Sequence, residues 1–296
     1  MKSGIISIYK ESGYTSHDVV AKMRGILGQK KIGHTGTLDP AAEGVLPVCL
    51  GKATKVCDLL TDQNKTYRTR MLLGTRTDTQ DLTGTVLEER PATCSEKEVV
   101  SAIQSFLGEY DQVPPMYSAL KVNGKKLCDL ARAGKEVERK ARRVLIHSIE
   151  IEEVNLPYVT MTVSCSKGTY IRTLCEDIGA RLGCGACMAT LLRTQAGPFS
   201  LAQSIRLGEL ETLVQQNRLD EVLIPVDRMF QQYPAVTAPE ALQKAIENGN
   251  RILAEDLGMA QGADTIRLYD ANGTFAGIYC YMPEQNDYKL RKLFWD

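Results

Sequence analysis

The sequence lacks several features that would place it in common functional classes. No apolar run reaches the roughly 18 residues that a membrane-spanning helix needs, so we expect no membrane association. The first residues, MKSGIISIYKESG, contain only a short apolar stretch and no small-residue cleavage site, which argues against a secretory signal and indicates a buried strand. We therefore expect a cytoplasmic protein.

Metal ligands are also scarce. The chain has only three histidines, and its nine cysteines include one CxxC pair, Cys184 and Cys187. That pair could be half of a zinc site or a redox pair, but no second CxxC completes a four-ligand site. An odd number of widely spaced cysteines favours free thiols in a reducing compartment. We predict no metal and no other cofactor.

The chain has no net charge, with 36 basic and 36 acidic residues, and the total gives no sign of a nucleic-acid partner. The distribution of these charges along the chain does give such a sign. Residues 1–143 hold 23 basic and 17 acidic side chains, whereas residues 144–296 hold 13 and 19. The excess is greatest in residues 119–143, with nine basic and three acidic side chains. Such a local field attracts phosphate groups, although a solvated helix face remains an alternative.

Hydrophobic periodicity predicts a mixed α/β protein. Ser16 and Ser95 are predicted helix caps, and Asn123-Gly124 predicts a tight turn. Alternation in residues 65–73 places Lys65, Tyr67 and Thr69 on one face of a strand. The main predicted elements are strands at 4–9, 65–73 and 158–166, helices at 16–27, 95–107 and 170–182, and loops at 28–44 and 74–84.

The residue pattern of the sequence changes after about residue 205. A helical connection leads to Pro225, and then to Pro234 and Pro239. The residues beyond contain short apolar segments separated by Asn-Gly and glycine-rich turns, which is typical of small β-rich modules. We predict two domains, residues 1–230 and residues 231–296.

The stretch GHTGTLDP, Gly33 to Pro40, combines two glycines, a histidine and a carboxylate. A phosphate-binding loop would need Lys-Ser or Lys-Thr after its last glycine, but Val45 follows Gly44. A metal site would need more ligands than this loop offers. A single carboxylate, Asp39, in a rigid loop suits nucleophilic or general-base chemistry. An Asp-Pro pair is also a common turn signature, so a structural role remains open.

The segment KKIGHTGTLDPAAEGVLPVCLGKATK strongly resembles the catalytic motif of the TruB family, the bacterial tRNA pseudouridine-55 synthases. The resemblance extends to KTYRTRMLLGTRTDTQDLTG, SKGTYIRTLCEDIGARLG and CMATLLRTQAGPF, and PAVTAPEALQKAIENGNRI is similar to part of a small PUA domain. It covers essentially the whole chain. It implies a mixed, mainly antiparallel central sheet with surrounding helices and loops, followed by a PUA-like RNA-binding module.

The resemblance also implies roles for individual residues. Asp39 would be the catalytic aspartate, attacking C1′ of the target uridine or abstracting its 2′ proton, and Arg172 would pair with it. Tyr67 would stack on the uracil and assist in removing the C5 proton. The other substrate-binding residues would be His34, Asp81, Tyr170 and Leu191, with Lys10, Lys65 and residues 119–143 as further RNA contacts. Without the resemblance, each has an ordinary interpretation as a core residue, turn cap or surface charge.

The implied activity is isomerisation of uridine to pseudouridine at position 55 of the tRNA T loop, on a base flipped out of the RNA. We expect a monomer that needs no protein partner. One alternative is an RNA chaperone that folds tRNA on the same surface. Another is the guide-RNA-dependent branch of the family, which the short C-terminal module and the lack of basic tails disfavour. A glycosidase would need a second carboxylate about 5–9 Å away, for which Asp81 is the only candidate.

Overall fold

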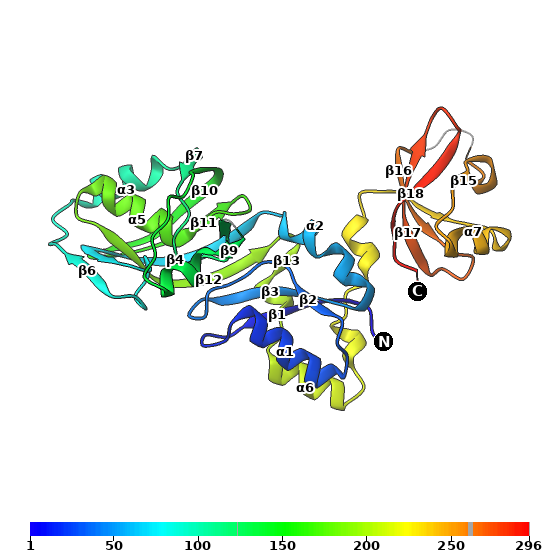
Figure 1. Ribbon diagram of the computed structural model, residues 1–296, viewed down its shortest axis with the longest axis horizontal. Helices are drawn as coiled ribbons and strands as arrows, with labels where there is room; N and C mark the ends of the chain where they lie inside the picture. The colour runs from blue at the N-terminus through cyan, green and yellow to red at the C-terminus, as the bar shows by residue number, and fades with distance from the viewer. Residues whose placement is uncertain (123, 260–262, 296) are drawn as a thin grey trace.

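The computed structural model describes residues 1–122, 124–259 and 263–295, and its main body is built on one large sheet (Figure 1). The nine strands of this sheet are β1 (Gly4–Lys10), β2 (Ile32–His34), β3 (Glu43–Leu50), β4 (Lys65–Leu73), β7 (Gly108–Gln112), β10 (Arg142–Asn155), β11 (Tyr158–Cys165), β12 (Ala186–Ala196) and β13 (Phe199–Ser200). Their order is β1-β3-β12-β4-β11-β10-β7, with β2 paired to β3 and β13 to β12. Among the described strand pairs of this sheet only β12 with β3 is parallel, so the predicted mixed, mainly antiparallel sheet is confirmed.

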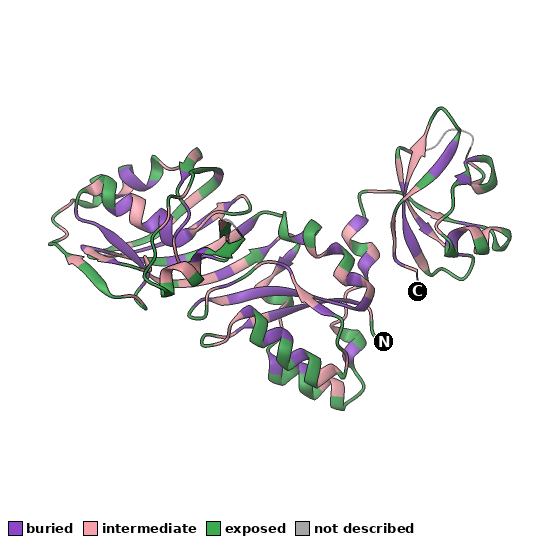
Figure 2. Cartoon of the chain, viewed as in Figure 1, coloured by how far each residue is buried: buried purple, intermediate pink, exposed green. Residues whose placement is uncertain are grey.

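Helices pack against this sheet in two groups (Figure 1). The helices α1 (Ser16–Leu27) and α6 (Leu207–Gln215) lie together, and α3 (Glu96–Gln104) packs beside α5 (Ile171–Leu182) at the far end of the sheet. Their outer surfaces are exposed, whereas the strands β1, β3 and β11 are largely buried (Figure 2). The shorter helices are η1 (Gly51–Val56), α2 (Cys57–Thr61), α4 (Leu127–Arg132), η2 (Leu201–Gln203), η3 (Leu219–Glu221), η4 (Val226–Phe230), η5 (Glu240–Leu242), α7 (Gln243–Glu247) and η6 (Glu255–Leu257). Within the described ranges, no helix has the length and apolar character needed to cross a bilayer.

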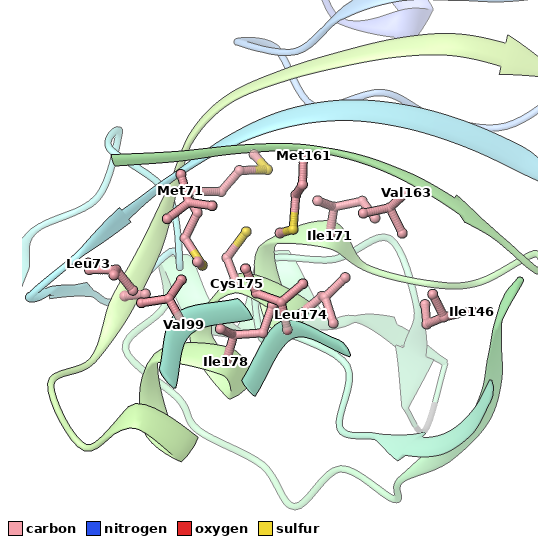
Figure 3. Close-up of a cluster of buried hydrophobic side chains, with 14 of the residues drawn as sticks. Met71, Leu73, Val99, Ile146, Met161, Val163, Ile171, Leu174, Cys175 and Ile178 are labelled. Atoms are coloured by element: carbon pink, nitrogen blue, oxygen red, sulfur yellow. The ribbon is translucent and has the colours of Figure 1, made fainter. Parts of the chain in front are cut away.

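A large hydrophobic core lies between the sheet and α5 (Figure 3). The side chains of Met71 on β4 and Met161 on β11 point toward Leu174 and Ile178 of α5, and all four are fully buried. The strand predicted at 158–166 is confirmed as β11, and every second residue of it faces this core. These residues are Val159, Met161, Val163 and Cys165, each with 0% exposure. The core thus fixes β4 and α5, the two elements that carry Tyr67 and Arg172.

The start of α1 differs from the prediction in an informative way. Thr15, not Ser16, is the N-cap: its hydroxyl accepts from the Asp18 amide, and the Asp18 carboxylate accepts from the Thr15 amide at 2.8 Å. Ser16 is fully buried, and its hydroxyl accepts a 2.9 Å hydrogen bond from the backbone N–H of Leu38. The prediction of Ser16 as the cap is wrong because this hydroxyl instead holds the loop that carries Asp39.

Both predicted loops contain a short strand. In residues 28–44, β2 pairs with β3, and in residues 74–84, β5 (Thr75–Thr77) pairs with β6 (Val86–Glu89). Strands of three residues are too short to show a periodic signal. The short strands β8 (Lys121–Val122) and β9 (Lys125–Lys126) flank the turn predicted at Asn123-Gly124, where residue 123 lies outside the described residues.

A second sheet forms the C-terminal part of the chain (Figure 1). Its five strands run in the order β14 (Ala235–Thr237), β16 (Thr265–Tyr269), β17 (Phe275–Met282), β18 (Asp287–Leu293) and β15 (Ile252–Leu253). Aromatic rings join it to the preceding segment, because the Phe230 ring lies 5.8 Å from Phe294 and 6.2 Å from Phe275. The β-rich character predicted for this region is confirmed.

Candidate active site

A pocket of about 540 Å³ opens where the β2–β3 loop faces β4, β12 and the start of α5. The structure brings together residues that are far apart in the sequence. Six of the residues implied by the resemblance line this pocket: Asp39, Lys65, Tyr67, Tyr170, Arg172 and Leu191. His34 and Asp81 are not among its lining residues.

Asp39 and Arg172 form a two-point ion pair at the pocket. Nε of Arg172 lies 2.9 Å from Oδ2 of Asp39, and Nη2 donates to Oδ1 at 3.2 Å. The Arg172 side chain is 5% exposed, whereas that of Asp39 is 37% exposed. Arg172 is also fixed by the backbone, since it donates to the carbonyls of Thr79 at 2.9 Å and Tyr117 at 2.8 Å. The pair therefore holds the carboxyl group in a defined direction while leaving part of it open to a ligand.

Lys10 anchors the loop that carries Asp39 from the interior of the protein. Lys10 is fully buried and its ammonium group donates to the carbonyls of Pro40 at 3.1 Å and Glu11 at 3.0 Å. Burial lowers the pKa of Lys10 to about 8. The expectation that Lys10 contacts RNA is wrong in this structure, because the side chain supports the Asp39 loop from inside the protein.

Tyr67 and Lys65 lie on one face of β4, as the alternation predicts. Tyr67 is half-buried, and burial raises the pKa of its hydroxyl. Lys65 is 7% exposed, and its ammonium group donates to the carbonyl of Gln63 at 2.6 Å. Burial lowers the pKa of Lys65 to about 8. Leu191 on β12 pairs in register with Thr69 and adds an apolar wall to the pocket.

Tyr170 is the N-cap of α5, so this helix begins at Ile171, one residue later than predicted. The side-chain amide of Gln112 holds both backbone groups of Tyr170. Gln112 Oε1 accepts from the Tyr170 N–H at 2.8 Å, and Nε2 donates to the Tyr170 carbonyl at 3.0 Å. Gln112 is 1% exposed and was not identified from the sequence. Gln112 therefore fixes the turn from which Tyr170 and Arg172 reach the pocket.

His34 and Asp81 have local structural partners. The His34 ring packs edge-on against His17 at 5.1 Å, and its Nδ1 lies 3.2 Å from the Gly36 carbonyl. Burial, followed by the neighbouring His17, lowers the pKa of His34, which favours the neutral ring.

Asp81 is 8% exposed and caps its own turn. Its Oδ1 accepts from the Thr79 hydroxyl at 2.8 Å and from the Thr83 amide at 2.9 Å. Its Oδ2 lies 3.8 Å from Nε of Arg172. Asp81 therefore adds a second, more distant negative charge behind the arginine.

Arg193 on β12 was missed in the sequence. It is 1% exposed, lines the pocket, and donates from Nε to the Val45 carbonyl at 2.7 Å. It pairs in register with Tyr67 on one side and with Gly44 on the other. A Cβ atom at Gly44 would lie 2.2 Å from the Arg193 carbonyl oxygen, and the Gly44 φ angle is +107°. Only glycine fits at this junction of β3 and β12.

Gly44→Ala is expected to lower the free energy of unfolding by more than about 3 kcal/mol, because backbone strain and a backbone clash combine. Urea denaturation measures this change. Gly108→Ala is the matched control, since Gly108 has a φ of +94° with no atom within 4 Å of the added Cβ. The control is expected to lose only about 1–2 kcal/mol. Equal losses in the two variants would show that the contact with Arg193 is not tight.

The described part of the chain shows neither a disulfide nor a cluster of metal ligands. All nine cysteines are unpaired, and no group of three or more His, Cys, Asp or Glu side chains could hold a metal ion there.

Comparison with known proteins extends the description of the site. Residues 24–171 match the model described as TruB family pseudouridylate synthase (N terminal domain), and residues 172–231 match that of the tRNA pseudouridylate synthase B C-terminal domain. A relative named tRNA pseudouridine synthase B from Lachnoclostridium phytofermentans is 50% identical, covering 99% of each chain. One of the same name from Clostridium kluyveri is 46% identical, covering 98% of this chain and 99% of the relative. The solved structure of a Cbf5-Nop10-Gar1 complex contains a similar chain, with 27% identity and a TM-score of 0.72 over 98% of this chain and 84% of that one.

Proposed function

The chain belongs to the TruB family of tRNA pseudouridine synthases, and from that membership we propose that it converts uridine 55 in the T loop of tRNA into pseudouridine. The observation that carries the proposal is the Asp39–Arg172 ion pair, with the carboxylate partly open to a pocket that Tyr67 also lines. The proposal includes activity without a guide RNA or a partner protein.

The chemistry fits these residues. The N1–C1′ bond of uridine must break, the uracil must turn, and a C5–C1′ bond must form, with no change in oxidation state. We propose that Asp39 acts on the sugar, either at C1′ or on the 2′ proton, while Tyr67, Tyr170 and Leu191 hold the detached uracil. A pocket of about 540 Å³ is large enough for a flipped nucleotide. A nucleotide in an RNA loop reaches such a pocket only after it leaves the base stack.

The direct experiment is incubation of the protein with an unmodified tRNA transcript, followed by mapping of pseudouridine. We expect conversion at position 55 alone and none in a transcript with cytidine at that position. Product without added guide RNA separates this activity from that of a guide-dependent enzyme. A protein that folds the transcript but leaves uridine 55 unchanged would be an RNA chaperone, and the proposed activity would be rejected.

We propose that the basic segment of residues 119–143 forms a rim for the RNA. Both ends of this segment line the pocket, through Ala119 and Leu120 and through Arg142 and Arg143. The field is weaker than the sequence count suggests, because Arg143 pairs with Asp111 at 3.1 Å and Glu109 at 3.2 Å. The basic residues of the β8–β9 hairpin and Arg142 are exposed and therefore available for phosphate contacts.

Neutralising Lys121, Lys125, Lys126 and Arg142 together is expected to weaken tRNA binding and flatten its salt dependence. The slope of log affinity against log salt concentration should fall by roughly one unit for each phosphate that the variant no longer binds. Filter binding over a salt series measures the slope. A control with the same change in charge replaces basic residues near α1 and α6, namely Lys22, Lys30, Lys31 and Arg218. If both variants change the slope equally, the rim is not the RNA-binding surface.

The C-terminal sheet is proposed to be a second RNA contact. The segment PAVTAPEALQKAIENGNRI resembles part of a PUA domain, and exposed Lys289 and Arg291 on β18 supply positive charge for phosphate contacts. We accordingly propose a catalytic domain at residues 1–230 and an RNA-binding module at residues 231–296.

A further inference from the structure

Arg193 is a buried cation whose hydrogen bonds are incomplete. Its side chain is among the largest of the fully buried ones, and its Nη2 atom has no hydrogen-bond partner among the described residues. A buried guanidinium without a full set of acceptors destabilises a folded protein, and an apolar residue of similar size would avoid that cost. The proposed roles of Asp39, Arg172 and Tyr67 do not explain why the chain places a positive charge here.

The geometry directs this charge at Tyr67. Arg193 and Tyr67 are direct partners across the antiparallel β12–β4 pair, so their side chains leave the same face of the sheet side by side. The bond from Nε to the Val45 carbonyl anchors the guanidinium on β3. A Cβ atom added to Gly36, in the loop that carries Asp39, would lie 3.9 Å from Nη1 of Arg193, so the guanidinium lies close to this loop. Arg193 thus occupies the space between the tyrosine and the catalytic loop.

We propose that Arg193 is a positioning residue for Tyr67, which holds the phenol toward the flipped base and stabilises its phenolate during C5 proton removal. This inference rests on the proposed function and deepens it. After C5 bonds to C1′, the Tyr67 hydroxyl gives its proton to water and the phenolate takes the C5 proton. The C5–H electron pair then forms the C5=C6 bond, the C6=N1 pair moves onto N1, and N1 takes a proton from water. The phenolate therefore exists as a reaction state and needs a nearby positive charge.

Among the charged groups around Tyr67, Arg193 is the one placed to stabilise the phenolate. Burial raises the pKa of Tyr67, Arg193 lowers it, and Cys165 on β11 and Asp39 in the loop raise it. Lys65, the next residue on this face of β4, has a pKa lowered to about 8, first by burial and then by Arg193. Lys65 also gives its ammonium hydrogen bonds to the backbone carbonyls of Thr61 and Gln63, whereas Arg193 lies opposite Tyr67 and its guanidinium keeps its charge throughout this range.

The test is a double-mutant cycle with Arg193→Gln and Arg193→Lys, each made alone and together with Tyr67→Phe. At saturating tRNA, Arg193→Gln is expected to slow single-turnover pseudouridine formation at least about tenfold, with unchanged tRNA affinity. Arg193→Lys, which keeps a cation, should recover part of the rate. In the Tyr67→Phe background the Arg193→Gln change should alter the rate by less than about twofold, because the hydroxyl through which it acts is absent.

An alkaline ultraviolet titration without RNA gives a second measurement. Subtracting the Tyr67→Phe curve from the wild-type curve isolates the ionisation of Tyr67. A neighbouring cation favours the phenolate, so Arg193→Gln should move this ionisation to higher pH. Arg193→Lys should move it as well, because a buried lysine loses its charge in this alkaline range. The matched control is Arg70→Gln, which removes an arginine stacked 4.0 Å from the Tyr158 ring on the neighbouring strand and should leave rate and titration unchanged.

Two results would overturn the inference: an equal loss of rate in the Tyr67 and Tyr67→Phe backgrounds, or an unchanged Tyr67 titration in Arg193→Gln. If Arg193→Gln fails to fold, as judged by circular dichroism, Arg193→Lys decides the question through the same two measurements. Failure of the proposed function is separately visible, because wild-type protein would then form no pseudouridine. The titration tests the Arg193–Tyr67 coupling in either case.

Discussion

Asp39→Asn is expected to fold and to bind tRNA with wild-type affinity, but to form pseudouridine at least about 1,000-fold more slowly than the wild type. An amide has nearly the shape of a carboxylate but can act neither as a nucleophile nor as a base. The fold should tolerate the change, because Arg172 keeps its bonds to the Thr79 and Tyr117 carbonyls and has Asp81 at 3.8 Å. Single-turnover assays and filter binding measure the rate and the affinity.

Asp62→Asn is the matched control for this prediction. Asp62 also lines the pocket and is paired with a cation, Lys167, at 2.9 Å, but it is 59% exposed and does not touch Arg172. Its replacement should leave the rate within a few-fold of wild type. Activity of Asp39→Asn within about tenfold of wild type would contradict a catalytic role. Loss of tRNA binding would instead make Asp39 a structural residue of the loop.

Tyr67→Phe is expected to bind tRNA normally and to react about 100-fold or more slowly, because it keeps the ring and removes the group proposed to take the C5 proton. Tyr67→Leu removes the ring as well and should also weaken the hold on the flipped base, since base–aromatic stacking contributes about 1–3 kcal/mol. Rates at saturating tRNA, together with measured dissociation constants, separate the two effects.

Tyr170→Phe provides the comparison within the same pocket. Gln112 holds Tyr170 by both backbone groups, so most of its positioning survives loss of the hydroxyl and of that group's contact with Ser118. We expect this variant to retain most of the wild-type rate. If Tyr67→Phe retains as much, Tyr67 has only a stacking role and proton removal belongs to another group.

Strand β4, which carries Lys65 and Tyr67, could be predicted from the sequence, whereas β12, which carries Leu191 and Arg193, was not predicted. Lys65, Tyr67 and Thr69 alternate with polar, more exposed residues, and a strand with one buried face must place such residues together. The Asp39–Arg172 contact has no comparable local signal, because the two residues are 133 positions apart. The expectation that they pair came from the resemblance to a family.

Residues whose role depends on a distant partner were missed or misread. Arg193 lies in an ordinary strand sequence, LLRT, and only the register of β12 against β4 and β3 reveals what it faces. Gln112 is a single amide in a short edge strand. Ser16 was misread as a cap because its hydrogen-bond partner, Leu38, is 22 positions away. Local propensity describes elements, whereas these three side chains connect them.

The parallel pairing of β12 with β3 also has a consequence for how the protein folds. It joins segments that are far apart in the sequence, since Val45 and Arg193 are separated by 148 positions. Contacts of such long range form slowly, because a large loop must close before they are made. During synthesis, β3 and β4 therefore keep unpaired edges until β12 leaves the ribosome. Any chain that ends before β12 presents those edges to other chains, which favours aggregation.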